Sequence, residues 1–135
     1  MKRLLDIGFR KVGDWSSSAT GIEFSLSDCS NARNILYCFV ADKSVLYVGK
    51  TTQTLNKRMY GYKNPGPTQS TNIKGKANIS GLLANGRQIE IYALPDNGLL
   101  HLGVFHINLA AGLEDSIVRN LNPPWNITGN TMREG

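Results

Sequence analysis

The sequence predicts an α+β domain in which a small, largely antiparallel β-sheet is flanked by helices. Two β-rich runs, ILYCFV at 35–40 and SVLYVG at 44–49, follow each other across a short polar connection, which is typical of a β-hairpin. After residue 50 the apolar positions change from a spacing of two to a helical spacing. With 135 residues, 41% of them hydrophobic, the chain can build one core without metal or disulfide staples.

Two further strands are indicated by alternation. In GIEFSLS, Ile22, Phe24 and Leu26 alternate with polar residues, which is the pattern of a half-buried strand. QIEIYALP, at 88–95, alternates in the same way and ends at Pro95. Together with the hairpin, these segments account for the predicted sheet.

The first predicted helix follows the hairpin directly. In TTQTLNKRMYGY, Leu55, Met59 and Tyr62 recur at helical spacing. Thr51 or Thr52 is expected to cap its start, because a threonine hydroxyl can accept a hydrogen bond from a free backbone N–H.

Two more helices are expected further along the chain. KNPGPTQST, at 63–71, is predicted to be a loop from its proline, glycine and serine content, and ANISGLLANG, at 77–86, to be a short helix that stops at its last glycine. LAAGLEDSIVRNL, at 109–121, has helical periodicity, and Pro123 and Pro124 prevent its continuation.

The charge distribution indicates an acidic partner. The formal net charge is +5, and no acidic residue occurs between Asp42 and Glu90. Such a surface favours nucleic acid or an anionic surface as partner, whereas a solvated basic face is the alternative. The basic residues inside this acid-free window are Lys43, Lys50, Lys57, Arg58, Lys63, Lys74, Lys76 and Arg87.

The cysteines and the hydropathy pattern bear on the compartment. Cys29 and Cys38 have no metal-ligand spacing, and Cys38 lies in an apolar run where a free thiol behaves as a small hydrophobe. The N-terminus lacks the apolar core of a signal peptide, and no run of eighteen apolar residues occurs. We therefore expect a reduced, cytoplasmic protein that does not cross a membrane.

The helical faces on which a few polar side chains lie make these side chains candidates for a functional site. Glu114 shares a helical face with Val118 and Leu121, so it is either paired with a buried cation, bound to a metal or titrating in a cleft. Arg58 and Tyr62 are four residues apart and lie on one helical face, although an arginine there could simply be solvated.

Taken together, these residue types suggest a phosphodiester hydrolase. An arginine can neutralise a phosphate with its planar fork, and a carboxylate can hold Mg²⁺. A tyrosine can relay a proton if a neighbouring cation, such as Lys50, lowers its pKa.

The ordered set of motifs resembles the GIY-YIG nuclease superfamily over roughly residues 34–127. LYC and YVG have the spacing of its paired signature, with Leu36, Cys38 and Val48 as departures. The later members of the set are Lys50, Arg58 with Tyr62 one turn on, Glu114, and Asn126 in NPPWN, twelve residues after the glutamate.

Within the superfamily, the chain is most similar to the small phage enzymes of the endonuclease II type. The features it shares are the YVGKT run leading to KR, LLANG followed by IEIYA, the pair Leu102 and Gly103 ahead of the glutamate, and NPPWNI. GIY-YIG restriction enzymes, some of which share the terminal WN, are the next most similar type.

The resemblance implies one GIY-YIG domain over 1–135, with a nuclease core at about 34–127 and an N-terminal extension at 1–33. It implies cleavage of double-stranded DNA with Mg²⁺ or Mn²⁺, and we expect self-association because cutting both strands requires two sites or one site that turns around. A non-catalytic basic DNA-binding module derived from a nuclease is the alternative.

The resemblance also implies roles for individual residues. Tyr37 is the first choice as general base, with Tyr47 in support or in exchange of that role, and Trp125 is expected to cover the core rather than to stack on a base. The remaining roles are Lys50 lowering a tyrosine pKa, Arg58 stabilising the pentavalent phosphate, Tyr62 contacting phosphate or water, Glu114 binding the metal, Asn126 orienting the site, and Lys57, Lys63, Lys74, Lys76 and Arg87 binding DNA.

Overall fold

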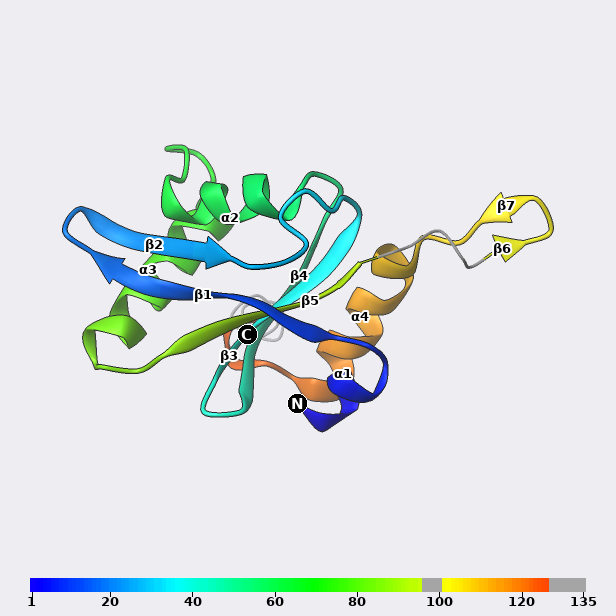
Figure 1. Ribbon diagram of the computed structural model, residues 1–135, viewed down its shortest axis with the longest axis horizontal. Coiled ribbons are helices and arrows are strands. Elements are labelled where there is room, and N and C mark those ends of the chain that lie inside the picture. The colour runs from blue at the N-terminus through cyan, green and yellow to red at the C-terminus, as the bar shows by residue number, and fades with distance from the viewer. Residues whose placement is uncertain (96–100, 127–135) are drawn as a thin grey trace, which may run out of the picture.

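The computed structural model describes residues 1–95 and 101–126 and confirms the predicted α+β class (Figure 1). Its centre is a five-stranded antiparallel sheet with the order β2-β1-β5-β3-β4. A two-stranded hairpin, β6 and β7, stands apart from it. The elements are α1 Lys2–Asp6, β1 Arg10–Ser18, β2 Gly21–Leu26, β3 Ile35–Ala41, β4 Ser44–Thr51, α2 Leu55–Lys63, α3 Ser70–Ala84, β5 Ile89–Pro95, β6 His101–Leu102, β7 Phe105–His106 and α4 Leu109–Leu121.

The strand β3 is buried along its whole length because helices cover both faces of the sheet. Successive side chains of a strand point to opposite faces. Tyr37 and Phe39 therefore pack with α2 and α3, whereas Leu36 and Cys38 pack with α1 and α4. This two-sided burial explains why ILYCFV is a continuous apolar run instead of an alternating one.

The helix α2 begins later than predicted. Its N-cap is Thr54, whose hydroxyl accepts a hydrogen bond from the Lys57 N–H at 3.1 Å. The prediction of Thr51 or Thr52 was wrong. Thr51 is still part of β4, where it pairs with Ile35, and a residue held in a strand cannot also begin the helix.

The helix α3 is longer than the predicted segment at 77–86, since it begins at Ser70. Its first half lacks an apolar pattern because the positions that face the core there are polar or small. Asn72 is buried, and Gly75 lies close against a ring of α2. A Cβ on Gly75 would lie 2.7 Å from the Tyr62 ring, so only glycine lets α3 pack on this ring. The loop is correspondingly shorter than predicted.

The strand β1 was missed, although it lies in the sheet between β2 and β5. A register shift between Lys11 and Gly13 breaks its alternation, so that Val12 and Trp15 are buried at a spacing of three. Part of the predicted N-terminal extension thus supplies two strands of the same sheet, while the domain limits stay a prediction. Among the described residues, no helix has the length and apolarity needed to span a bilayer.

Candidate active site

Three side chains meet where β3 faces α2. The hydroxyl oxygens of Tyr37 and Tyr62 lie 2.6 Å apart. Arg58 donates from Nε to the Tyr37 hydroxyl at 3.1 Å and from Nη2 to the Tyr62 hydroxyl at 2.9 Å. Its guanidinium also lies 4.2 Å from the centroid of the Tyr62 ring. The predicted pairing of Arg58 and Tyr62 on one helical face is confirmed, and this arginine is not simply solvated.

The YVG motif has a geometric reason at this site. On β4, Gly49 pairs with Tyr37 of β3, so the tyrosine ring crosses directly over the glycine. A Cβ at position 49 would lie 2.6 Å from the Tyr37 hydroxyl oxygen. Glycine is required because any side chain there would push Tyr37 away from Arg58.

A buried asparagine completes the surroundings of the arginine. Asn72, on α3, accepts a hydrogen bond from Arg58 Nη1 at 2.7 Å, and its own amide donates to Gln69 Oε1 at 3.1 Å. The same Gln69 oxygen accepts from the Gly66 N–H at 2.8 Å. The sequence analysis missed Asn72, because it lies between the loop predicted at 63–71 and the helix predicted at 77–86.

The hydrogen bonds indicate which way the tyrosine protons point. Tyr37 is 0% exposed and already accepts from Arg58, so its own O–H needs the Tyr62 oxygen as acceptor. Tyr62 is itself only 1% exposed, and its hydroxyl proton then has no acceptor in Tyr37 or Arg58. Burial, reinforced by the neighbouring tyrosines, raises the pKa of both Tyr37 and Tyr62.

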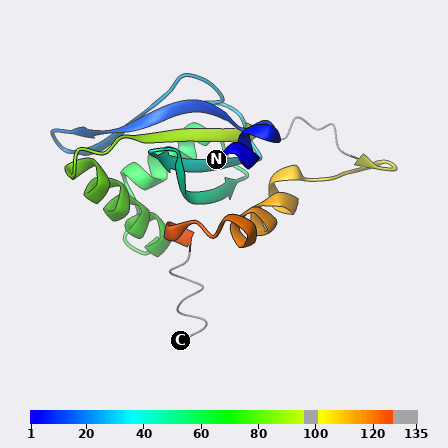
Figure 2. The ribbon, with the colours of Figure 1, turned by 90° about the horizontal axis from the view of Figure 1, so that it is seen from below.

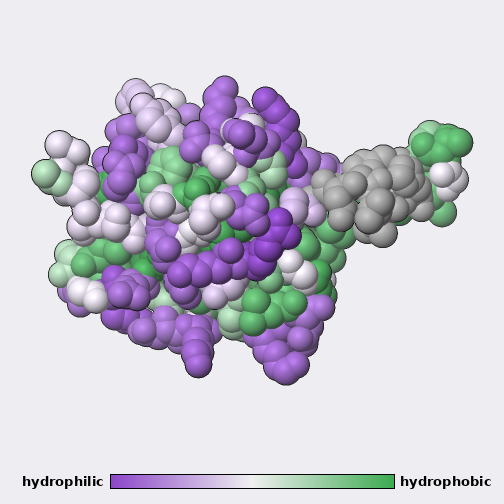
Figure 3. All heavy atoms as spheres, viewed as in Figure 1, coloured by the Kyte–Doolittle hydropathy of each residue, from purple (hydrophilic) through white to green (hydrophobic). Residues whose placement is uncertain are grey.

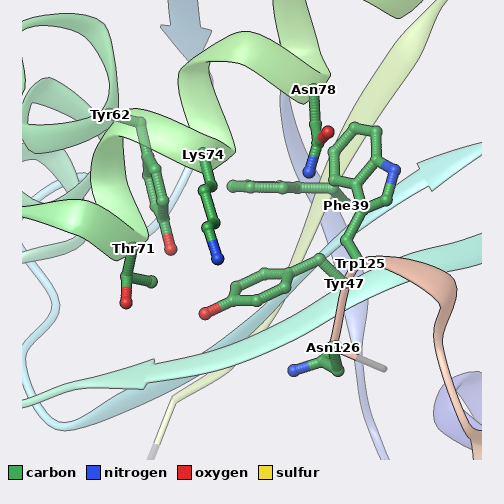
Figure 4. Close-up of a pocket in the computed structure, with 9 residues that line it drawn as sticks. Phe39, Tyr47, Tyr62, Thr71, Lys74, Asn78, Trp125 and Asn126 are labelled. Atoms are coloured by element: carbon green, nitrogen blue, oxygen red, sulfur yellow. The ribbon is translucent and has the colours of Figure 1, made fainter. Parts of the chain in front are cut away.

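Tyr47 occupies a different position from Tyr37. Its ring is on the same face of the sheet, 6.3 Å from the Tyr37 ring, but it is only partly buried and lines the cleft together with Tyr62, Lys74 and Trp125. Figure 4 shows Lys74 pointing between the hydroxyls of Tyr47 and Tyr62. Of the two signature tyrosines, Tyr47 is therefore the one that a ligand can reach.

Lys50 and Glu114 lie on the opposite face of the sheet. Lys50 pairs with Leu36, whose side chain packs toward α4, and its Nζ is 3.8 Å from Glu114 Oε1. The two side chains are 48% and 29% exposed. Lys50 thus lies across the sheet from the Tyr37 ring, and its effect on a tyrosine pKa stays a prediction.

Asn126 ties the segment that follows α4 to the edge strand of the sheet. Its side chain accepts from the Val48 N–H at 2.9 Å and donates to the Val48 carbonyl at 3.0 Å. These two groups of the edge strand β4 would otherwise face solvent. The contact carries the segment after α4 toward α3, as Figure 2 shows, and sets Trp125 beside the cleft.

The basic residues predicted to bind DNA divide into two groups. Lys63 is paired with the Glu23 carboxylate at 2.9 Å, and Arg87 is paired with Asp42. Within the described part of the chain, no acidic group pairs with Lys57, Lys74 or Lys76.

Comparison with known proteins shows which class of proteins shares this fold. No protein-family profile and no curated protein matches the sequence. Solved structures do match: the fold is that of endonucleases. The chain has the fold of bacteriophage T4 EndoII, a GIY-YIG nuclease that was solved as a glutamate-to-alanine mutant. The TM-score is 0.73 at 25% identity, over 94% of this chain and 98% of that one.

A second neighbour shares the fold alone. The restriction endonuclease HPY188I, solved in complex with product DNA, has a TM-score of 0.54 at 16% identity, over 87% of this chain and 76% of that one. The predicted resemblance to GIY-YIG nucleases is confirmed at the level of structure, while the roles of individual residues stay predictions.

Proposed function

We propose that this protein is a GIY-YIG endonuclease that hydrolyses phosphodiester bonds in double-stranded DNA with the help of a divalent metal ion. The observation that carries the proposal is the fixed guanidinium of Arg58. Three of its five N–H donors are used by Tyr37, Tyr62 and Asn72, which leaves two for a phosphate. A cation fixed in this way stabilises charge that develops on a phosphate during attack without having to reorganise.

The tyrosines take unequal parts in this proposal. Tyr47, which reaches the cleft, is the better candidate to relay a proton: its oxygen accepts a proton from the attacking water while its own hydroxyl proton passes to a phosphate oxygen. Tyr37 is sealed in the core with a raised pKa. The Tyr62 hydroxyl keeps its proton and donates a hydrogen bond to a phosphate oxygen. Attack in line with departure of the 3′ oxygen, which takes a proton from water, leaves a 5′-phosphate and a 3′-hydroxyl.

Glu114 fits a metal ion that needs few protein ligands, such as Mg²⁺. Within the described residues, no three His, Cys, Asp or Glu side chains cluster as a metal site. Mg²⁺ needs no such cluster, because it keeps several waters and is held by one or two carboxylates together with substrate phosphates. Because β4 is the edge strand of the sheet, a phosphate that lies across this edge can be reached from both faces. There Glu114 would hold the ion, which would supply positive charge for the scissile phosphate, and the Lys50 ammonium would separate from the carboxylate.

The unpaired cations support the DNA-binding part of the proposal. Lys57, Lys74 and Lys76 are free of ion pairs within the described chain and can neutralise phosphates, whereas Lys63 and Arg87 are engaged by acids. Lys74 also lines the cleft beside the tyrosines. We therefore assign phosphate contacts first to these three lysines.

The β6 and β7 hairpin supports self-association. Leu102, Val104 and Phe105 are 75%, 88% and 74% exposed, and Figure 3 shows them as a hydrophobic tip that projects from the body. Such a tip is costly to leave in water, and a second copy of the chain would cover it. Sedimentation should give an oligomer that Phe105→Ser converts to a monomer; a monomeric wild type would contradict this.

Plasmid nicking separates catalysis from the alternative of a non-catalytic DNA-binding module. We expect purified protein to convert supercoiled plasmid to nicked circles with Mg²⁺ or Mn²⁺ and to leave it intact with EDTA. Arg58→Ala, purified in parallel, controls for a contaminating nuclease. Plasmid that is bound but never cut, across both metals, would contradict the proposal and favour the binding module.

A further inference from the structure

A cleft of about 260 Å³ lies between α3, β4 and the segment after α4 (Figure 4). One of its walls is aromatic. Tyr47 stacks on Phe39 with an interplanar angle of 29°, and Trp125 meets Phe39 edge to face at a centroid distance of 6.5 Å. Trp125 packs against the core and also lines the cleft, so covering the core and contacting a ligand are not exclusive roles.

The opposite wall is polar and comes from one helix. Thr71, Lys74 and Asn78 share a face of α3, because they are three and four residues apart. Within the described part of the chain, none of these three side chains has a hydrogen bond or an ion pair with another group. Their donors and acceptors are therefore open to a ligand.

The two walls together match a flat heteroaromatic ring. An aromatic wall binds the face of such a ring, and an amide such as that of Asn78 matches the donors and acceptors on its edge. No carboxylate lines the cleft, so it offers no ligand for a divalent cation. Since a cavity of about 150 Å³ holds benzene, the volume here is sufficient for a nucleobase.

We propose that this cleft takes one nucleobase of the strand that is cut, rotated out of the duplex. The proposal rests on the proposed function, since Tyr47, which would contact the scissile phosphate, lines the same cleft. The base next to that phosphate must leave its stack to enter. Trp125 and Tyr47 replace the lost stacking, and Asn78 contacts the edge of the base.

The test compares two short duplexes that differ at one base pair. One is fully paired, and in the other a single base lies opposite an abasic site, so that it has no pairing to lose. Affinity is measured by fluorescence anisotropy in EDTA, so that nothing is cut and the result does not depend on catalysis. Nick positions are then mapped with Mg²⁺.

We expect wild-type protein to bind the duplex with the unpaired base at least tenfold more tightly and to nick it next to that base. In Asn78→Ala and in Trp125→Leu, the ratio of the two affinities should fall to about one. Asn120→Ala, an exposed asparagine on α4 outside the cleft, is the matched control and should keep the ratio.

Equal wild-type affinities for the two duplexes would overturn the base pocket. So would a preference that persists in both cleft variants, since the greater flexibility of the abasic duplex would then explain it. Failure of the proposed function would give another result. The protein would then cut neither duplex in the presence of metal, whatever the ratio of the two affinities in EDTA.

Discussion

The two sides of the sheet hold their candidate catalytic groups in different ways. On the side of α2 and α3, Arg58 is fixed by hydrogen bonds of 2.7 to 3.1 Å to three buried partners. On the side of α4, Lys50 and Glu114 face each other across 3.8 Å and remain partly exposed. The first arrangement fixes its charged group on several sides, whereas the second holds its carboxylate by a long contact.

Replacing Arg58 should have the largest effect because it removes both function and support. Arg58→Ala should lower turnover by about 10³-fold or more, as loss of a preorganised donor does. It should also cost about 2–3 kcal/mol of stability, because buried tyrosine and asparagine oxygens lose their donor. Arg58→Lys should recover little, since an ammonium lacks the planar fork. Wild-type turnover in the lysine variant would contradict this role.

Replacing Glu114 should reduce cleavage as strongly as replacing Arg58, but it should hardly change the free energy of unfolding. Glu114→Gln keeps the shape and removes the charge that would hold the metal, so turnover should collapse while DNA affinity stays equal or rises. Because the Lys50 pair is long and partly exposed, stability should change by less than about 1 kcal/mol. Thermal melting and plasmid nicking on one preparation test both; a variant that melts much earlier yet still cuts would reject the assignment.

Asn72 should have an intermediate effect, as a positioning residue for Arg58. We expect Asn72→Ala to lower kcat by roughly 10- to 100-fold, about 1.4 to 2.7 kcal/mol, with little change in KM. Asn72→Asp places a carboxylate against the guanidinium and should lower kcat at least as far while keeping the melting temperature. Ile73→Ala, exposed on the same helix, is the control. Unchanged kcat in both Asn72 variants would show that Asn72 only packs.

The effect that is smallest at neutral pH should be an alkaline loss of stability that comes from the Arg58 side of the sheet. The pKa values of Tyr37 and Tyr62 are raised by burial, so above about pH 10 the unfolded chain loses protons that the folded chain keeps. Stability should therefore fall as pH rises past that point, by up to about 1.4 kcal/mol per unit for each tyrosine.

Urea unfolding between pH 8 and 11 measures this slope. Tyr37→Phe should make it shallower, whereas Glu114→Gln should leave it unchanged because Glu114 lies across the sheet. An equal slope in Tyr37→Phe would show that other groups carry the alkaline loss.

The sequence by itself determined what depends on short spacings. The β-rich runs put Tyr37 and Tyr47 on the two strands of one hairpin, and the helical period put Arg58 and Tyr62 on one face of α2. The same local rules determined the α+β class. They failed for β1 and for the start of α3, where a register shift and a glycine contact take the place of an apolar repeat.

Only the tertiary structure decided how deep each group lies and which distant group it meets. It sealed Tyr37 in the core and opened Tyr47 to the cleft, and it set Lys50 against Glu114 instead of a tyrosine. It also joined Asn126 to Val48 across 78 positions. The physical reason is that spacing along one element fixes only direction, whereas burial and partners depend on how separate elements pack.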